Sequence, residues 1–316
     1  MLCGPAAAAA PAPGPEPVVA VTAPTIGGCP AFPARNYWNT DISALPVDSR
    51  SAAWLSHMST TRNLHPDFGP SYSTTEPDYG IPITTVMTGH PLVPVTFDYA
   101  SESDQVKYPL GSDTRVEGGL ASSGDRHTVV VNTSTCRLYE TWLTRKSGSR
   151  WLAGSGATWA LGGNRLRTDG WTSADAAGLP ILPGLLRWDE VKAGAVNHAI
   201  RFTTNSTAAA HLWPARHDAG SGSVASYPPM GARFRLKASY DASALGAQAK
   251  VVVTAMKHYG LVLADNGSPW YFQGEQNAAW PDALISDLKK IPASAFEAVD
   301  TRSMRVSTDS ALANQP

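Results

Sequence analysis

Short stretches in which apolar and polar side chains alternate are the feature that most limits how this chain can fold. Residues 232–240 (ARFRLKASY) alternate almost without a break. A period of two is typical of a β-strand with one buried face, because successive side chains point to opposite sides. Further strand candidates lie at 93–99, 125–132, 136–143, 198–205, 261–265 and 270–274. The pattern therefore predicts a mainly β fold.

Helical spacing of apolar side chains is rarer. It occurs at residues 247–259 and 281–291, and residues 188–194 could form one or two further turns. Many short strands, together with 27 Gly and 25 Pro residues, favour a sandwich or barrel. We therefore expect a single-domain β-sandwich or jelly-roll with two or three short helices.

The two ends of the chain differ in composition from the part between them. Residues 1–24 are rich in Ala and Pro, like the end of a signal peptide and the Pro-rich linker after it. Residues 304–316 are polar, and we expect them to be a disordered tail. Residues 25–303 contain no repeat and no linker, so we expect one β-rich domain there.

The charge of the chain excludes several classes of function. Its net charge is −1, and charged residues make up 16% of it. Nucleic-acid binding normally needs clustered Lys and Arg, and a membrane helix needs about 18 consecutive apolar residues. Neither feature occurs, so we expect neither partner. We expect a secreted monomer, since low charge with many turn residues is typical of extracellular domains.

No motif in the sequence indicates a cofactor or a metal. There is no nucleophile elbow, phosphate-binding loop or dinucleotide fingerprint, and no HExxH or paired CxxC spacing. We therefore expect no cofactor and no resident metal.

Two of the three cysteines are candidates for a disulfide. Cys3 lies in the Ala/Pro stretch, which leaves Cys29 and Cys136. A bridge closing about 107 residues would stabilise an exported domain by about 4–5 kcal/mol. Two unrelated free thiols are the alternative.

Residues 125–142 form the stretch with the most chemical content. With a turn at 132–135, the strands on either side form a hairpin. The facing pairs would be Val131 with Cys136, Val129 with Leu138, His127 with Glu140, and Asp125 with Trp142. All eight side chains would share one face, whose far end carries an imidazole, two carboxylates and an indole.

That far end could act as an acid/base site. A carboxylate partner orients His127 and raises its basicity, and carboxyls near apolar surface can act as general acids. Asp125 and Glu140 are the candidate acid/base pair. The same residue types also bind metals. A charge-paired rim closing the end of a sandwich is the structural alternative, and a register slip of one residue would separate the pair.

A long irregular segment, residues 171–184, supplies a further carboxylate candidate, Asp175. Such segments in compact domains are often functional loops, although Asp175 could equally cap a turn. We interpret Asp265-Asn266-Gly267 as a tight turn before a strand.

Aromatic side chains beside polar loops could bind sugars. Flat rings pack on the C–H faces of sugars while their polar edges form hydrogen bonds. The candidates are Trp142, Trp171, Trp188 and Trp213.

Several longer motifs are specific enough to mark a family. They include GDRHTVVVNTSTCRLYE, GWTSADAAGLPILPGLLRWDEV, WPARH and YGLVLADNGSPWY, and they fall within residues 29–300. Through them the chain resembles a family of uncharacterised exported proteins, mainly of soil bacteria. The resemblance implies a free-standing extracellular module of one domain, and it implies no particular activity.

These observations favour a secreted glycoside hydrolase that acts on an extracellular polysaccharide by carboxylate acid/base catalysis. Glu140, Asp125, His127 and Asp175 would form its site. Two alternatives remain open. One is a non-catalytic glycan- or surface-binding module, and the other is a metal-dependent hydrolase that uses His127, Glu140 and a distant His.

Overall fold

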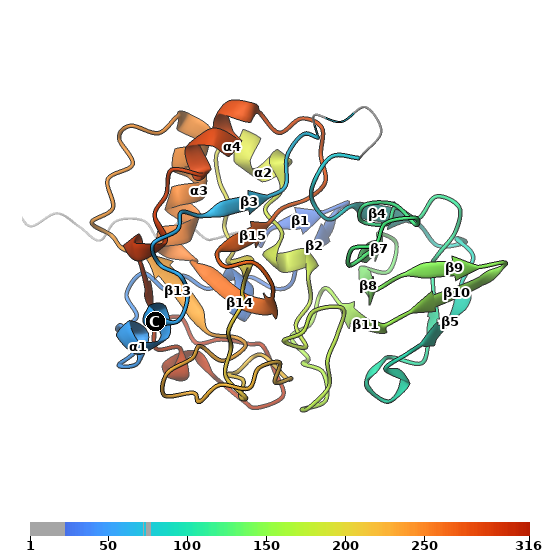
Figure 1. Ribbon diagram of the computed structural model, residues 1–316. Coiled ribbons are helices and arrows are strands. Elements are labelled where there is room, and N and C mark those ends of the chain that lie inside the picture. The colour runs from blue at the N-terminus through green and yellow to red at the C-terminus, as the bar shows by residue number, and fades with distance from the viewer. Residues whose placement is uncertain (1–22, 72, 74–76) are drawn as a thin grey trace, which may run out of the picture.

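The computed structural model describes residues 23–71, 73 and 77–316. Nearly all of the Ala/Pro-rich segment 1–24 lies outside the described residues. The fold is mainly β, with four α-helices in the described part of the chain. Sheets and helices divide into two parts, which lie side by side in Figure 1. The predicted fold class, mainly β with sandwich-like packing and few short helices, is confirmed.

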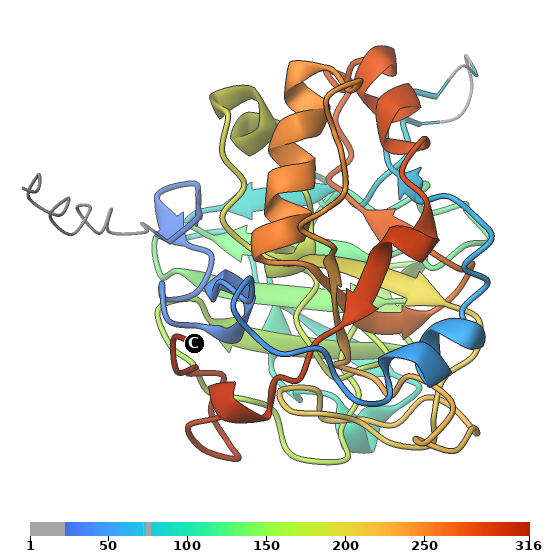
Figure 2. The ribbon, with the colours of Figure 1, turned by 90° about the vertical axis from the view of Figure 1, so that its left-hand side faces the viewer.

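A mixed six-stranded sheet forms the larger part. Its strands, in spatial order, are β16 (Phe296–Ala298), β13 (Arg233–Leu236), β14 (Leu261–Asn266), β12 (Ile200–Thr204), β15 (Tyr271–Gln273) and β3 (His65–Asp67). The helices α2 (Trp188–Ala193), α3 (Ala247–His258) and α4 (Asp282–Leu288) lie together on one side of it (Figures 1 and 2). The helix α1 (Ser51–Ser56) contacts the sheet edge at β16.

Two four-stranded sheets form the smaller part. One has the order β11 (Ser155–Ala160), β8 (Arg137–Trp142), β7 (Thr128–Asn132), β4 (Ile83–Val86). The other has the order β6 (Lys107–Tyr108), β5 (Val93–Phe97), β10 (Arg150–Ala153), β9 (Arg145–Ser147). Apolar side chains from both sheets, including Phe97, Val130 and Trp151, form one buried cluster. The two sheets therefore pack face to face as a small sandwich.

The predicted disulfide between Cys29 and Cys136 is confirmed, with a Cα–Cα distance of 5.3 Å. It joins the two-stranded hairpin of β1 (Thr25–Ile26) and β2 (Cys29–Pro30) to the turn between β7 and β8. The described residues contain no helix that is long and apolar enough to span a membrane.

The carboxyl-terminal segment 304–316 is packed, so the expectation of a disordered tail is wrong. Met304, Ala311 and Ala313 are buried. The backbone of Leu312 pairs with that of Asn36 near the start of the fold. Small apolar side chains spaced two apart fill gaps in the core here, a pattern too short to stand out in a polar stretch.

The register of the β7–β8 hairpin differs by two residues from the prediction. Asn132 pairs with Arg137, and Val129 faces Glu140. Cys136 has a left-handed backbone, with φ +49°, and belongs to the turn instead of the strand. Because side chains alternate with a period of two, this shift preserves the faces and changes only the partners. His127 and Glu140 therefore do not face each other.

Candidate functional site

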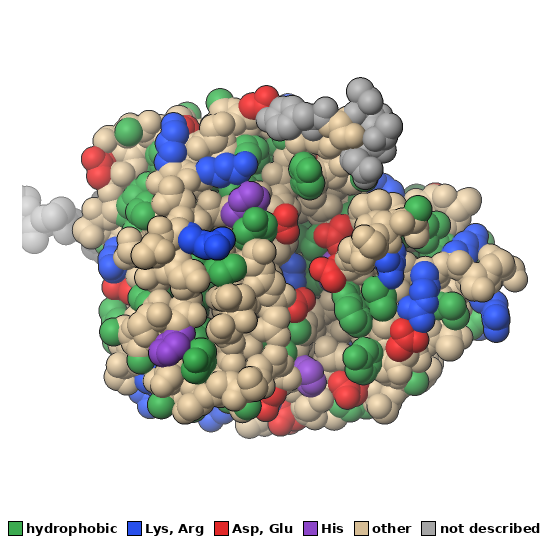
Figure 3. Space-filling view, viewed as in Figure 1, with side chains coloured by type: hydrophobic (Ala, Val, Ile, Leu, Met, Phe, Trp, Pro, Cys, Tyr) green, Lys and Arg blue, Asp and Glu red, His purple; other side chains and the backbone are tan. Residues whose placement is uncertain are grey.

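A cleft of about 390 Å³ lies between the two parts of the molecule. In Figure 3, acidic side chains gather along the hollow that separates these parts. Its lining comes from strand ends and loops of both parts: Tyr99, Glu102, Asp125, Trp142, Ser155, 172–176, His217, Asp265 and Asn266. A cleft of this size, with converging polar groups, is the usual form of a small-molecule site.

A β-bulge brings Asp265 to the cleft. In β14 the pairing with β12 passes from Leu263 directly to Asp265, which leaves Ala264 as an extra residue. Bulges re-aim the side chains next to them. The carbonyl of Ala264 accepts a hydrogen bond from the backbone N–H of Ala177 at 2.9 Å. The bulge therefore also anchors the loop that carries Asp175.

The loop around Asp175 is held by its own backbone. The carbonyl of Asp175 accepts hydrogen bonds from the N–H groups of Ser173 and Gly178. Gly178 has φ +69°, and a Cβ there would lie 2.5 Å from the carbonyl oxygen of Trp171. Only glycine fits this turn. The predicted functional loop thus adopts one defined shape, with Asp175 at the cleft floor.

Arg201, the second residue of β12, forms an ion pair with Asp175. Its Nη2 and Nε donate to the two carboxylate oxygens of Asp175 at 2.9 and 3.1 Å, and both side chains are buried. Arg201 also lies 3.7 Å from the Asp265 carboxyl. The pKa of Asp175 is raised, because burial outweighs the charge and hydrogen bonds of Arg201. The bidentate pair gives the buried Asp175 carboxylate a counter-charge.

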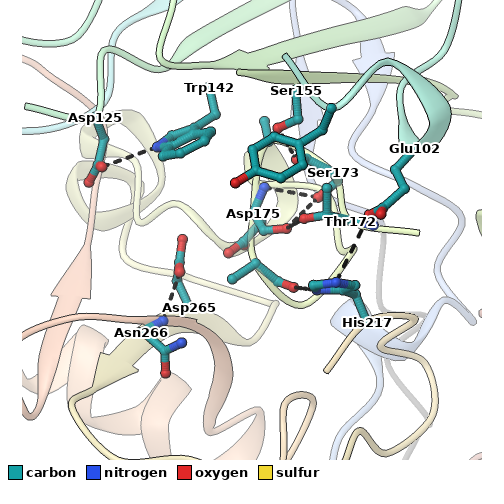
Figure 4. Close-up of a pocket in the computed structure, with 13 residues that line it drawn as sticks. Glu102, Asp125, Trp142, Ser155, Thr172, Ser173, Asp175, His217, Asp265 and Asn266 are labelled. Atoms are coloured by element: carbon teal, nitrogen blue, oxygen red, sulfur yellow. Dashed lines mark hydrogen bonds and ion pairs between the residues drawn. The ribbon is translucent and has the colours of Figure 1, made fainter. Parts of the chain in front are cut away.

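Asp175 and Asp265 both line the cleft, and the Arg201 guanidinium lies beside both carboxyl groups. Burial, and then the negative charge of Asp175, raise the pKa of Asp265 to about 7. In Figure 4 the two groups lie beside each other near the centre of the cavity. A pKa near 7 lets Asp265 carry a proton in part at neutral pH, as a general acid needs.

Asp125 and Trp142 form one wall of the cleft (Figure 4). The indole Nε1–H of Trp142 donates to Asp125 at 3.1 Å. This contact agrees with the predicted neighbourhood of the two residues, although the strand register differs. Tyr99 lies beside Trp142, with ring centroids 6.3 Å apart. Asp125 is exposed and faces a cleft with an aromatic surface.

Glu102 and His217 form the opposite wall. Their side chains lie 3.9 Å apart, and the backbone N–H of Thr172 donates to Glu102 at 3.1 Å. His217 also contacts the carbonyl of Ala176 through Nδ1. Nothing in the sequence pattern marks Glu102, which lies in a short 3₁₀ turn.

His127 pairs with Glu117 and not with Glu140. The His127 Nδ1 to Glu117 distance is 2.6 Å. Burial alone would lower the pKa of His127, but the charge and hydrogen bonds of Glu117 raise it to about 9. The Nε2 atom of His127 is buried without a hydrogen-bond partner among the described residues. His127 lies outside the cleft lining.

Glu140 is buried and does not line the cleft, which corrects its assignment as the acid. Its carboxylate accepts hydrogen bonds from the backbone N–H groups of Ile181 and Leu182 at 2.8–3.1 Å. Burial raises its pKa to about 7, against those hydrogen bonds. Its role is to anchor the 181–182 backbone to the hairpin.

The four candidate tryptophans lie in four different places. Trp142 lines the cleft, and Trp171 lines a neighbouring cavity. Trp188 packs against Trp280 at the start of α2. Trp213 packs against Tyr37 on another surface.

The described residues contain no group of three or more His, Cys, Asp or Glu side chains placed to hold a metal ion. The metal ligands proposed from the sequence do not come together. His127 pairs with Glu117, whereas Glu140 accepts a hydrogen bond from the backbone N–H of Leu182.

Besides Glu102, the sequence did not reveal Arg201 or the position of Asp265 in the cleft. In the sequence, Asp265 belongs to an Asp-Asn-Gly stretch that is typical of a turn. Only the bulge in β14 shows that its side chain is directed toward the cleft. Arg201 lies in a stretch whose alternation suggests an exposed position, yet every residue of β12 is buried. Comparison with known protein families, curated proteins and solved structures finds no match for this chain.

Proposed function

We propose that this protein is a glycoside hydrolase that cleaves an extracellular polysaccharide in the cleft between its two parts. The observation that carries the proposal is that two carboxyl groups line one cleft: Asp265, whose pKa burial raises to about 7, and the exposed Asp125. Glycosidic cleavage needs one carboxylic acid and one carboxylate.

Asp265 supplies the proton. It donates to the glycosidic oxygen as the bond to the anomeric carbon breaks, and the sugar leaves as an alcohol. The negative charge left on Asp265 is stabilised by Arg201, which lies 3.7 Å away. The negative charge of Asp175 raises the pKa of Asp265 and so favours its protonated form, while the Asp175 carboxylate itself is paired with Arg201.

Asp125 is the second carboxylate. It acts on the opposite side of the anomeric carbon, either by taking a proton from the attacking water or as the nucleophile. The anomer released first, read by proton NMR, distinguishes these routes. Trp142 holds Asp125 through its indole N–H and, with Tyr99, offers a flat surface to a sugar ring.

Export is part of the proposal. A disulfide persists in oxidising compartments, and Cys29–Cys136 joins positions 107 residues apart in the chain. A polysaccharide outside the cell is a substrate that such a protein can reach.

The test compares turnover of a polysaccharide panel by the wild type with that by Asp265→Asn and Asp125→Asn. Each variant should lose at least about 100-fold in kcat, the lower range for acid/base catalysis. The wild-type rate should fall as pH rises through about 7, because Asp265 then loses its proton.

Asp113→Asn is the matched control, since Asp113 is exposed and lies outside the cleft. It should keep wild-type turnover. Glycan binding without product release would contradict hydrolysis and favour the non-catalytic binding module. Full turnover by Asp265→Asn would remove the assigned acid.

A further inference from the structure

A second cavity of about 410 Å³ adjoins the cleft. The two cavities are lined by neighbouring residues of the same segments: Glu102 and Thr172 in the cleft, Asp104 and Trp171 in the second cavity. Its other main side chains are Trp159, Arg137, Arg165 and Arg167.

Arg167 builds the wall between the two cavities. Its guanidinium donates to the Asp104 carboxylate at 2.9 Å, and to the carbonyls of Glu102 and Thr172 at 2.6 and 2.9 Å. It also lies over the rings of Trp159 and Trp171, within 6 Å of each centroid. Each of its three nitrogens already donates to the protein, so Arg167 fixes the wall between the cavities.

Two other guanidiniums remain available. Arg165 is exposed, and its side chain has no hydrogen bond or ion pair among the residues described. Arg137 donates once, from Nη2 to the hydroxyl of Thr158 at 2.8 Å, and has no acidic partner there. A guanidinium has five N–H donors in a planar fork, which matches a carboxylate or a sulfate.

The two cavities have opposite charge. The second cavity is lined by three Arg and one Asp, whereas the cleft is lined by four acidic residues and no Lys or Arg. An anionic sugar unit is therefore repelled from the cleft and attracted to the second cavity. This difference in charge between the cleft and the second cavity determines which sugar unit of a polymer binds in each.

We propose that the second cavity is a subsite for an anionic sugar unit, whose carboxylate or sulfate is bound by Arg165 and Arg137 beside Trp171. Resting on the proposed function, this makes the substrate an acidic polysaccharide, with the anionic unit next to the cleaved linkage. Trp171 then keeps a sugar-binding role, in the subsite and not in the cleft.

The test measures equilibrium binding to three polymers of equal length: polygalacturonate, its methyl-esterified neutral form, and dextran sulfate. The full chain carrying Asp265→Asn is used, so that cleavage does not consume the ligand. We expect an acidic polymer to bind at least about tenfold more tightly than the neutral one, with binding that weakens as salt increases. Whichever acidic polymer binds more tightly identifies the anion as carboxylate or sulfate.

Arg165→Gln and Arg137→Gln should each weaken binding of the acidic polymer about tenfold and leave binding of the neutral one unchanged. Arg150→Gln is the control, because Arg150 is exposed and lines neither cavity. The unfolding midpoint of Arg165→Gln should equal that of the wild type. Equal binding of charged and neutral polymers, binding to none, or unchanged binding by Arg165→Gln would overturn the subsite. These readouts do not depend on turnover, so the subsite and hydrolysis can fail separately.

Discussion

Asp265→Asn should make the protein more stable at alkaline pH while it removes the acid of the cleft. The pKa of Asp265 rises from 3.8 to about 7 in the folded protein. A carboxyl whose folded pKa is raised stabilises the fold fully below pH 4. That stability is lost as pH rises to about 7, because the unfolded chain gives up its proton first. Asn has no proton to lose.

The magnitude follows from the width of this interval. For each pH unit between about 4 and 7, the free energy of unfolding of the wild type falls by about 1.4 kcal/mol relative to that of the variant. The total difference is about 4 kcal/mol. Because the Asp265 side chain keeps 26% of its surface exposed, water screens part of this effect. We expect a gain of about 2–4 kcal/mol for Asp265→Asn at pH 8.

Urea unfolding of both proteins from pH 4 to pH 9 measures this difference. The two free energies of unfolding should agree near pH 4 and diverge steadily up to about pH 7. Asp113→Asn is the control: His90 lowers the pKa of Asp113 by a hydrogen bond, so its effect has the opposite sign and stays small. Free energies that run parallel for Asp265→Asn and wild type across the whole range would refute the protonated state of Asp265.

Three further predictions concern stability and are measured by denaturant unfolding at neutral pH. Arg201→Gln should cost about 3–5 kcal/mol, because it leaves Asp175 buried without its counter-charge; a loss below about 1 kcal/mol would contradict the buried pair. Replacing both Cys29 and Cys136 by Ser should cost about 4–5 kcal/mol through a loop of 107 residues, and an unchanged midpoint would show that the bridge constrains little. Met304→Ala should cost about 2–5 kcal/mol if the end of the chain is packed, whereas a disordered tail would leave stability unchanged.

Local patterns predict the secondary structure well. The alternation at 261–265 appears as β14, and the helical spacing at 247–259 appears as α3 (Ala247–His258). Both signals depend on neighbours a few residues apart, which the chain itself specifies. The short α1 at Ser51–Ser56 has too few residues to show such a period.

The β7–β8 hairpin shows where local reasoning ends. Alternation places Val129 and Glu140 on the same face of the hairpin, and a two-residue shift in register does not change this. The shift does change which residues pair across the two strands, because the turn conformation of Cys136 sets the pairing. The sequence therefore predicts correctly which side chains share a face, but not which residues pair.

The cleft combines three expected residues with others that no spacing reveals. Asp125, Trp142 and Asp175 are predicted site residues, and all three line it. Glu102 reaches it from a short turn, and Asp265 from a bulged strand of the larger part. These positions are tens to hundreds of residues apart in the chain.

The sequence by itself determined the β character, the disulfide partners and two of the acidic residues, because these depend on local periods and on which residues remain after elimination. Only the tertiary structure decided that the pKa of Asp265 is raised. That shift depends on burial and on the charges of Asp175 and Arg201, three residues carried by separate segments. Charge and solvent exposure act through space, so they become defined only when the sheet and the loop meet at the bulge.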